Sequence, residues 1–166
     1  MALHSLLQYL APVKPEEREE TGYFSLKKIL PDQSEDHQLL VKKALSILNG
    51  EDAKILFGEN SRAELPIFVH GEKDGSPVTI IGRIDRTIAE NYSVLLVDFK
   101  SSANIPASPE QTSQQYLIQM GLYLRCGEKL FPDHSVSTAI YWTENQTMMP
   151  LQNDLVLEAT KGFNIT

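Results

Sequence analysis

The chain has 166 residues, a net charge of −7 and a single cysteine. The length fits one domain that can bury about two-thirds of its unfolded surface. The acidic balance argues against a protein that coats DNA through a basic surface, but it is compatible with an enzyme that binds nucleic acid in one local groove beside a metal. Cys126 alone excludes an internal disulfide and an all-cysteine metal or iron–sulfur site. With no bilayer-length apolar run and no signal peptide, we expect a cytoplasmic protein with no membrane partner.

The first 57 residues have the periodicity of helices. Leucines at helical spacing predict a helix over 3–11, and prolines follow it. A second helix is expected over 15–30, a third from Ser34 to about Asn49, and a short helical turn at 51–57. Because the chain begins almost at the first helix, we expect it to be a fragment of a longer protein.

From residue 62 the pattern changes to strands. Strands are expected at 63–69, 78–88 and 94–99, close enough in sequence to form a meander. A loop without periodicity at 101–114, a helix at about 113–126, a strand at 136–143 and a short helix within 151–161 follow. The helix at about 113–126 makes a crossover connection, so the strand at 136–143 is expected to join the sheet in parallel. We therefore predict one α/β domain, 1–166, with a central mixed β-sheet flanked by helices: a helical segment at 1–57 and a catalytic core at 62–161.

The strand at 94–99 contains the most informative pair of residues. Asp98 interrupts an apolar run, and Lys100 follows two positions later. Side chains alternate along a strand, so both point to the same face, about 7 Å apart along the chain. A carboxylate at the end of a buried strand is costly unless it is paired or holds a metal.

Asp85, on the preceding strand, is a second carboxylate that can converge with Asp98 at one end of the sheet. Hard cations such as Mg²⁺ take oxygen ligands and usually need only one or two protein carboxylates. Such a metal polarises a phosphoryl oxygen, and a neighbouring lysine can position or deprotonate water or stabilise developing charge. Taken alone, a D-x-K pattern is more often a surface salt bridge.

Five separated pieces, in order, resemble the RecB-family branch of the PD-(D/E)XK nucleases, most closely the C-terminal nuclease domain of AddA-type helicase–nuclease subunits. They are HSLLQYL with His4, AELPI with Glu64, GRIDR with Asp85, VDFKS with Asp98 and Lys100, and YLIQMGLY with Gln119 and Tyr123. AIYWTENQTMMPL near the end is also similar, so the resemblance spans nearly the whole chain. Phe99 and Ser101 stand where the D-Y-K-T version has tyrosine and threonine.

The resemblance implies a restriction-endonuclease-like core and metal-dependent hydrolysis of DNA. His4, Asp85, Asp98 and the backbone carbonyl of Phe99 would bind Mg²⁺ or Mn²⁺, with Lys100 as the catalytic lysine. Gln119 and Tyr123 would border the site. Because the loop 101–114 directly follows Lys100, we expect it to contact the substrate strand. The setting it implies is exonucleolytic cleavage of single-stranded DNA during double-strand break repair and recombination. The strand would be delivered by a helicase motor in the same chain, together with a second helicase–nuclease subunit, and no iron–sulfur cluster is expected.

Simpler interpretations of the same residues stay open. A histidine such as His4 on a helix is more often a surface or half-buried residue than a ligand. Glu64 is a third acid near the metal or a partner of Arg62 or Arg83, and Gln119 and Tyr123 can be ordinary residues at the edge of the core. Two further classes of protein also stay open: a non-catalytic module that binds nucleic acid or docks a partner, and a structural interaction domain in which Asp98 and Lys100 form a salt bridge.

Overall fold

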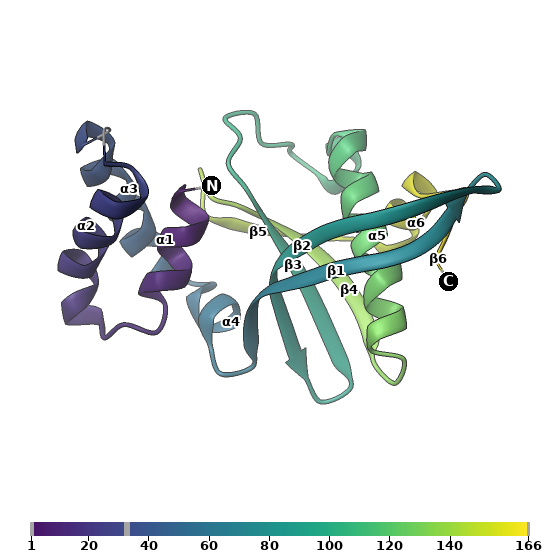
Figure 1. Ribbon diagram of the computed structural model, residues 1–166, viewed down its shortest axis with the longest axis horizontal. Helices are drawn as coiled ribbons and strands as arrows, with labels where there is room; N and C mark the ends of the chain where they lie inside the picture. Colours follow the sequence, from purple (N-terminus) through teal and green to yellow (C-terminus); the bar gives the residue numbers. More distant parts are fainter. Residues whose placement is uncertain (1, 32–33, 166) are drawn as a thin grey trace. The chain divides into compact units, whose positions relative to one another are not determined.

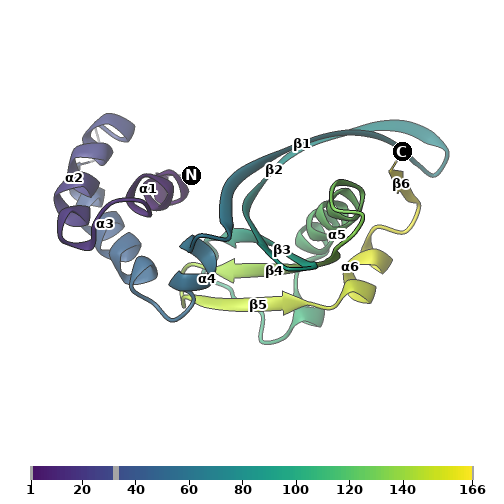
Figure 2. The same cartoon turned by 90° about the horizontal axis from the view of Figure 1, so that it is seen from below.

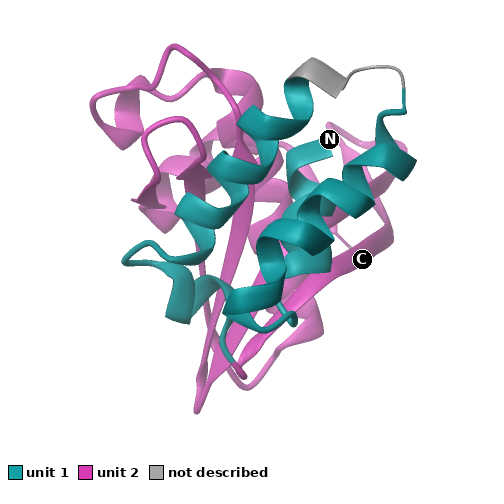
Figure 3. Ribbon diagram, turned by 90° about the vertical axis from the view of Figure 1, so that its left-hand side faces the viewer, with its two compact units in different colours: residues 1–58 teal, residues 59–166 magenta. Residues whose placement is uncertain are grey.

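The computed structural model describes residues 2–31 and 34–165. The chain divides into two compact units, residues 1–58 and 59–166, which Figure 3 shows in different colours.

The first unit is helical. It contains α1 (Ala2–Leu10), a 3-10 turn (Pro15–Glu17), α2 (Arg18–Ile29), α3 (Ser34–Leu48) and α4 (Ala53–Phe57). The leucine stripe of α1 packs against α2 and α3, and all four of its leucines are buried: Leu3, Leu6, Leu7 and Leu10. Gly22 on α2 allows the close approach, since a Cβ at this position would lie 3.1 Å from Cγ2 of Val41.

Two interpretations of α3 were wrong. Helical spacing predicts that Leu39 belongs to the buried stripe of α3, and His37, which fits no ligand pattern, is expected at the surface. Leu39 is instead exposed, and His37 is buried together with Val41 and Ala44. The Nε2 atom of His37 donates to the carbonyl oxygen of Leu30 at 2.7 Å. Ala44 and Leu48 are buried as predicted, but the buried face also includes His37, because its imidazole satisfies a carbonyl at the end of α2.

The second unit is a six-stranded mixed sheet in the order β5-β4-β3-β2-β1-β6. Its strands are β1 (Ser61–Lys73), β2 (Ser76–Glu90), β3 (Ser93–Lys100), β4 (Ser135–Trp142), β5 (Thr147–Leu151) and β6 (Phe163–Ile165). The first three strands form an antiparallel meander, and β4 pairs with β3 in parallel after the crossover through α5 (Gln114–Leu130). The α/β class, the meander and the parallel final pairing are thus confirmed (Figure 1).

Strands β1 and β2 are longer than predicted. Asp74 and Gly75 both have positive φ, +50° and +79°, as a two-residue type I′ hairpin turn requires. This tight turn lets the pairing run on to Lys73 and Ser76. Two short edge strands, β5 and β6, were not predicted; β5 contains Pro150 and β6 has three residues, so neither has a clear alternating pattern.

The core of the second unit lies between one face of the sheet, α5 and α6 (Asn153–Ala159). Figure 2 shows β1 and β2 curling over α5, so that the helix lies between these two strands and β4. Helical spacing places Leu117 and Leu124 on the core-facing side of α5 and Met120 and Tyr123 on another side, but Met120 and Tyr123 are also buried in the core cluster. No helix in the described part of the chain is long and apolar enough to cross a bilayer.

Candidate active site

Asp98 and Lys100 lie together at the end of β3. Their side chains share a face, as strand alternation predicted, and the Nζ atom of Lys100 lies 2.6 Å from Oδ2 of Asp98. The side chains are only 5% and 16% exposed, respectively. The pair is therefore a largely buried ion pair, and the alternative of an exposed surface salt bridge does not apply.

Gln119, on α5, joins this pair to the helix. Its Oε1 accepts a hydrogen bond from Nζ of Lys100 at 2.7 Å, and its Nε2 donates to Oδ1 of Asp98 at 3.1 Å. An ammonium can only donate and a carboxylate can only accept, so these two neighbours fix the orientation of the amide. Gln119 thus holds the acid and the lysine in one arrangement.

Tyr123 extends the network one helical turn further. Its hydroxyl accepts from Nε2 of Gln119 at 3.0 Å and donates to the carbonyl oxygen of Arg83 on β2 at 2.9 Å. Burial raises the pKa of Tyr123; the charges of Asp98 and Asp85 also raise it, while the hydrogen bonds to Gln119 and Arg83 oppose the shift. The phenol therefore stays protonated and keeps donating to β2.

Gly82 makes room for this tyrosine. A Cβ at Gly82 would lie 3.2 Å from Cε1 of Tyr123, tighter than ordinary van der Waals contact. This close approach explains the glycine that the sequence places three residues before Asp85.

Asp85 lies on β2 and is half-buried. Its Oδ2 accepts a hydrogen bond from the backbone N–H of Phe99 at 2.7 Å, which directs the carboxylate toward β3, next to Asp98. The Phe99 ring packs against Tyr141 at a centroid distance of 5.5 Å, so its backbone, and not its side chain, belongs to the site. The structure therefore brings Asp85, Asp98, Lys100, Gln119 and Tyr123 into one connected cluster, which we call the charged cluster.

Glu64 pairs with Arg83, one of the two partners left open by the sequence. Its φ of +58° lies in the left-handed region, which is unusual for a glutamate inside a strand and costs about 1–3 kcal/mol. The residues on either side of it pair with Arg86 and Ile84, so Glu64 lies across from Asp85. Burial lowers the pKa of Arg86, and the charges of Asp85 and Glu64 act in the opposite direction. Two acids, Glu64 and Asp85, and two arginines, Arg83 and Arg86, therefore lie next to one another on β1 and β2 beside the charged cluster.

His4 lies on α1, half-buried beside the leucine stripe, in the first compact unit. Its role as a metal ligand stays a prediction.

The donors of the charged cluster fit a hard divalent cation. Asp85, Asp98 and the Phe99 carbonyl offer only oxygen atoms, the ligand type that Mg²⁺ and Mn²⁺ prefer. Within residues 2–31 and 34–165, no three His, Cys, Asp or Glu side chains gather as a complete metal cage. Two carboxylates nevertheless match Mg²⁺, which usually keeps several waters and shares its coordination with substrate phosphate.

Sequence reasoning missed two features around Lys100. Thr143 holds the strand end, since its N–H donates to the carbonyl oxygen of Lys100 at 2.9 Å. The ring of Tyr116, on α5, lies under the ammonium of Lys100, with its centroid 4.7 Å from Nζ. Tyr116 precedes Gln119 by three positions, so shared helix-face spacing was the signal that could have identified it.

Comparison with known proteins gives one family and a set of distant structures. The model of the PD-(D/E)XK nuclease superfamily matches residues 1–159. A protein from Eubacterium rectale, provisionally described as an exonuclease, aligns with a TM-score of 0.53 and 15% identity over 96% of this chain and 62% of its own. A second structure, that of SSO0001, aligns with a TM-score of 0.39 and 16% identity over 78% of this chain and 67% of its own. A comparison with curated proteins gave no match.

Proposed function

Because this chain belongs to the PD-(D/E)XK nuclease superfamily, we propose that it is a divalent-metal-dependent deoxyribonuclease that hydrolyses phosphodiester bonds. The observation that carries the proposal is the largely buried Asp98–Lys100 pair, held by Gln119 next to Asp85. Burying charged groups in this way is expensive, and active sites are where proteins most often accept such a cost.

In this proposal each member of the charged cluster has a task. Asp85, Asp98 and the Phe99 carbonyl would hold Mg²⁺ or Mn²⁺, with His4 as a further ligand. The bound ion would polarise the phosphoryl oxygen and lower the pKa of its water. Lys100 would position the attacking water, accept its proton or stabilise the charge that develops on the phosphate. Gln119 would keep Lys100 beside Asp98, and Tyr123 would keep Gln119 in place.

The substrate we propose is single-stranded DNA, cleaved from an end. The net charge of −7 supports a partner that carries the cationic DNA track, since phosphate binding normally needs a basic surface. We propose that this partner is a helicase motor in the same chain, acting in the cytoplasm with a second helicase–nuclease subunit in double-strand break repair and recombination. The resemblance to AddA-type subunits supports this setting. The Eubacterium rectale protein, of which this chain spans 62%, is provisionally described as an exonuclease.

The decisive experiment measures cleavage of linear single-stranded DNA with Mg²⁺, with Mn²⁺ and with EDTA. We expect metal-dependent cleavage that Asp98→Ala and Lys100→Ala each abolish, while Lys161→Ala, which changes an exposed lysine, does not. Resistance of circular single strands would identify end-dependent cleavage. Unchanged activity in both Asp98→Ala and Lys100→Ala would contradict the site assignment.

Calorimetric titration with Mn²⁺ separates this proposal from a non-catalytic module of the same fold. We expect binding that is lost in Asp85→Ala and in Asp98→Ala. No binding that depends on these two carboxylates would favour the module.

A further inference from the structure

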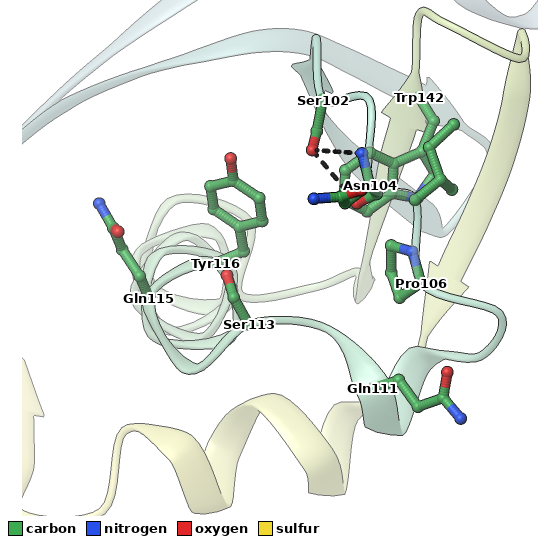
Figure 4. Close-up of a pocket in the computed structure, with 9 residues that line it drawn as sticks. Ser102, Asn104, Pro106, Gln111, Ser113, Gln115, Tyr116 and Trp142 are labelled. Atoms are coloured by element: carbon green, nitrogen blue, oxygen red, sulfur yellow. Dashed lines mark hydrogen bonds between the residues drawn. The ribbon is translucent and has the colours of Figure 1, made fainter.

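A cavity of about 440 Å³ opens directly beside the charged cluster. Tyr116 and Trp142 line it together with the loop that follows Lys100, which contributes Ser102, Asn104 and Pro106. Figure 4 shows Tyr116 from α5 and these loop residues around the opening. The volume lies within the range of about 300–1,000 Å³ that small-molecule sites occupy.

The cavity lies next to Lys100. Trp142 is the register partner of Lys100 in the parallel β3–β4 pair. The ring of Tyr116 contacts the Lys100 ammonium at 4.7 Å and also lines the cavity. A phosphate beside Lys100 would therefore place an adjoining nucleotide next to this opening.

Trp142 supplies a second, independent observation. The residue is 1% exposed, and within the described residues its Nε1 has no hydrogen-bond partner. A buried N–H without an acceptor costs about 1–3 kcal/mol. Trp142 also lines the cavity, so a ligand with an acceptor edge satisfies this donor once it reaches Nε1, which protein atoms cover in the free chain.

The lining selects the chemistry of the occupant. None of the residues that line the cavity is charged, so the cavity does not suit a phosphate or a cation. Tyr116 is half-buried and offers aromatic surface, with its ring centroid 6.1 Å from that of the buried Trp142. Asn104 and Gln115 offer amides that both donate and accept. A flat, neutral ring with a polar edge matches these features.

We propose that this cavity, the base pocket, binds the unpaired nucleobase of a nucleotide next to the scissile phosphate. The base stacks on Tyr116, and an acceptor atom on its edge takes the hydrogen bond from Nε1 of Trp142. Bases inside a duplex cannot enter such a pocket, whereas splayed single-stranded bases commonly stack on aromatic side chains. The base pocket rests on the proposed nuclease function and gives it a structural reason for preferring single strands.

The test uses fluorescein-labelled dT12 bound to the full chain in EDTA, where no cleavage occurs. In a series of oligonucleotides, a single abasic residue replaces each thymidine in turn. We expect one position at which base removal weakens binding roughly five- to hundredfold, the range for loss of one stacked base. Trp142 is the single tryptophan of the chain, so its emission should change with intact dT12 and not with the oligonucleotide abasic at that position.

Variants assign the effect to the pocket. Tyr116→Leu should weaken binding of intact dT12 and abolish the penalty for the abasic position, since the stacking partner is already gone. Trp142→Phe should weaken binding several-fold while keeping the ring. Tyr92→Leu, which changes a tyrosine that is 80% exposed near the β2–β3 turn, should preserve the whole pattern.

Two results would overturn the base pocket: equal penalties at every position, or a penalty that persists in Tyr116→Leu. If either occurs while cleavage still depends on Asp98 and Lys100, only the base pocket fails. If the chain neither binds dT12 nor cleaves single strands with Mg²⁺ or Mn²⁺, the proposed function fails as well.

Discussion

The charged cluster and the base pocket, which are neighbours at the end of β3, differ in whether their buried polar groups have partners. In the charged cluster, an ion pair and two hydrogen bonds of 2.6–3.1 Å join Asp98, Lys100 and Gln119, and the ion pair is the contact of Oδ2 of Asp98. In the base pocket, the N–H of Trp142 has no acceptor within the described residues. Tyr116 lies between the two regions, since its ring contacts Lys100 of the charged cluster and also lines the base pocket.

The difference follows from the cost of burial. An unpaired buried charge costs far more than an unpaired neutral donor, so the protein must pair its charges before any ligand arrives. A single neutral N–H can stay without a partner until a ligand binds, at a cost of about 1–3 kcal/mol. The charged cluster should therefore contribute to stability without substrate, and the base pocket should matter mainly for binding.

Lys100→Met gives the largest expected effect on stability. The substitution keeps the length of the side chain but leaves Asp98 buried without its cationic partner. We expect the free energy of unfolding to fall by about 3–5 kcal/mol, the usual cost of breaking a buried ion pair from one side. Urea denaturation in EDTA measures this change.

Lys161→Met is the matched control for this prediction. Lys161 pairs with Glu158 at 3.4 Å, and the two side chains are 79% and 74% exposed. Exposed pairs contribute only about 0–1 kcal/mol, so the control should unfold almost as the unchanged protein does. Equal losses for the two lysines would mean that the Asp98–Lys100 pair is no more important for stability than a surface pair.

Gln119→Ala should have the next largest effect. The amide makes three hydrogen bonds, to Lys100, Asp98 and Tyr123, and its loss leaves partly buried partners unsatisfied. We expect a loss of about 1–3 kcal/mol in the free energy of unfolding and slower metal-dependent cleavage. The control Gln114→Ala, at an exposed position on the same helix, should change stability by no more than about 0.5 kcal/mol. A loss as small as that of the control would show that Gln119 does not hold the cluster together.

The sequence predicts much of the charged cluster because strand alternation is a local rule. The spacing of Asp98 and Lys100 fixed their shared face, and the short connections predicted the antiparallel meander that brings Asp85 beside them. The crossover helix predicted the parallel β3–β4 pair. The hydrogen bonds from Gln119 to Asp98 and Lys100 were beyond this reasoning, because they depend on how α5 packs against the end of β3.

The base pocket could not be predicted, for a physical reason. Its two aromatic residues come from α5 and β4, and its polar residues come from a loop without periodicity and from the first turn of α5. No local pattern relates these segments, so only the folded chain brings them together. The errors on Leu39 and His37 have a related origin, because a histidine that bonds a distant carbonyl overrides the rule that polar residues face solvent.

The smallest and sharpest test makes one chemical change at two places on α5. Tyr123→Phe removes a hydroxyl that bonds Gln119 and Arg83, so we expect a loss of about 0.5–1.5 kcal/mol in the free energy of unfolding. The hydroxyl of Tyr116 makes no hydrogen bond within the described part of the chain, so Tyr116→Phe should change stability by at most about 0.5 kcal/mol. It should also leave dT12 binding intact, because the ring provides the stacking surface. Urea denaturation and fluorescence anisotropy measure the two quantities. Equal losses of stability in both variants would contradict the distinction between a charged cluster whose polar groups are paired in the free chain and a base pocket whose polar groups are paired only when a ligand binds.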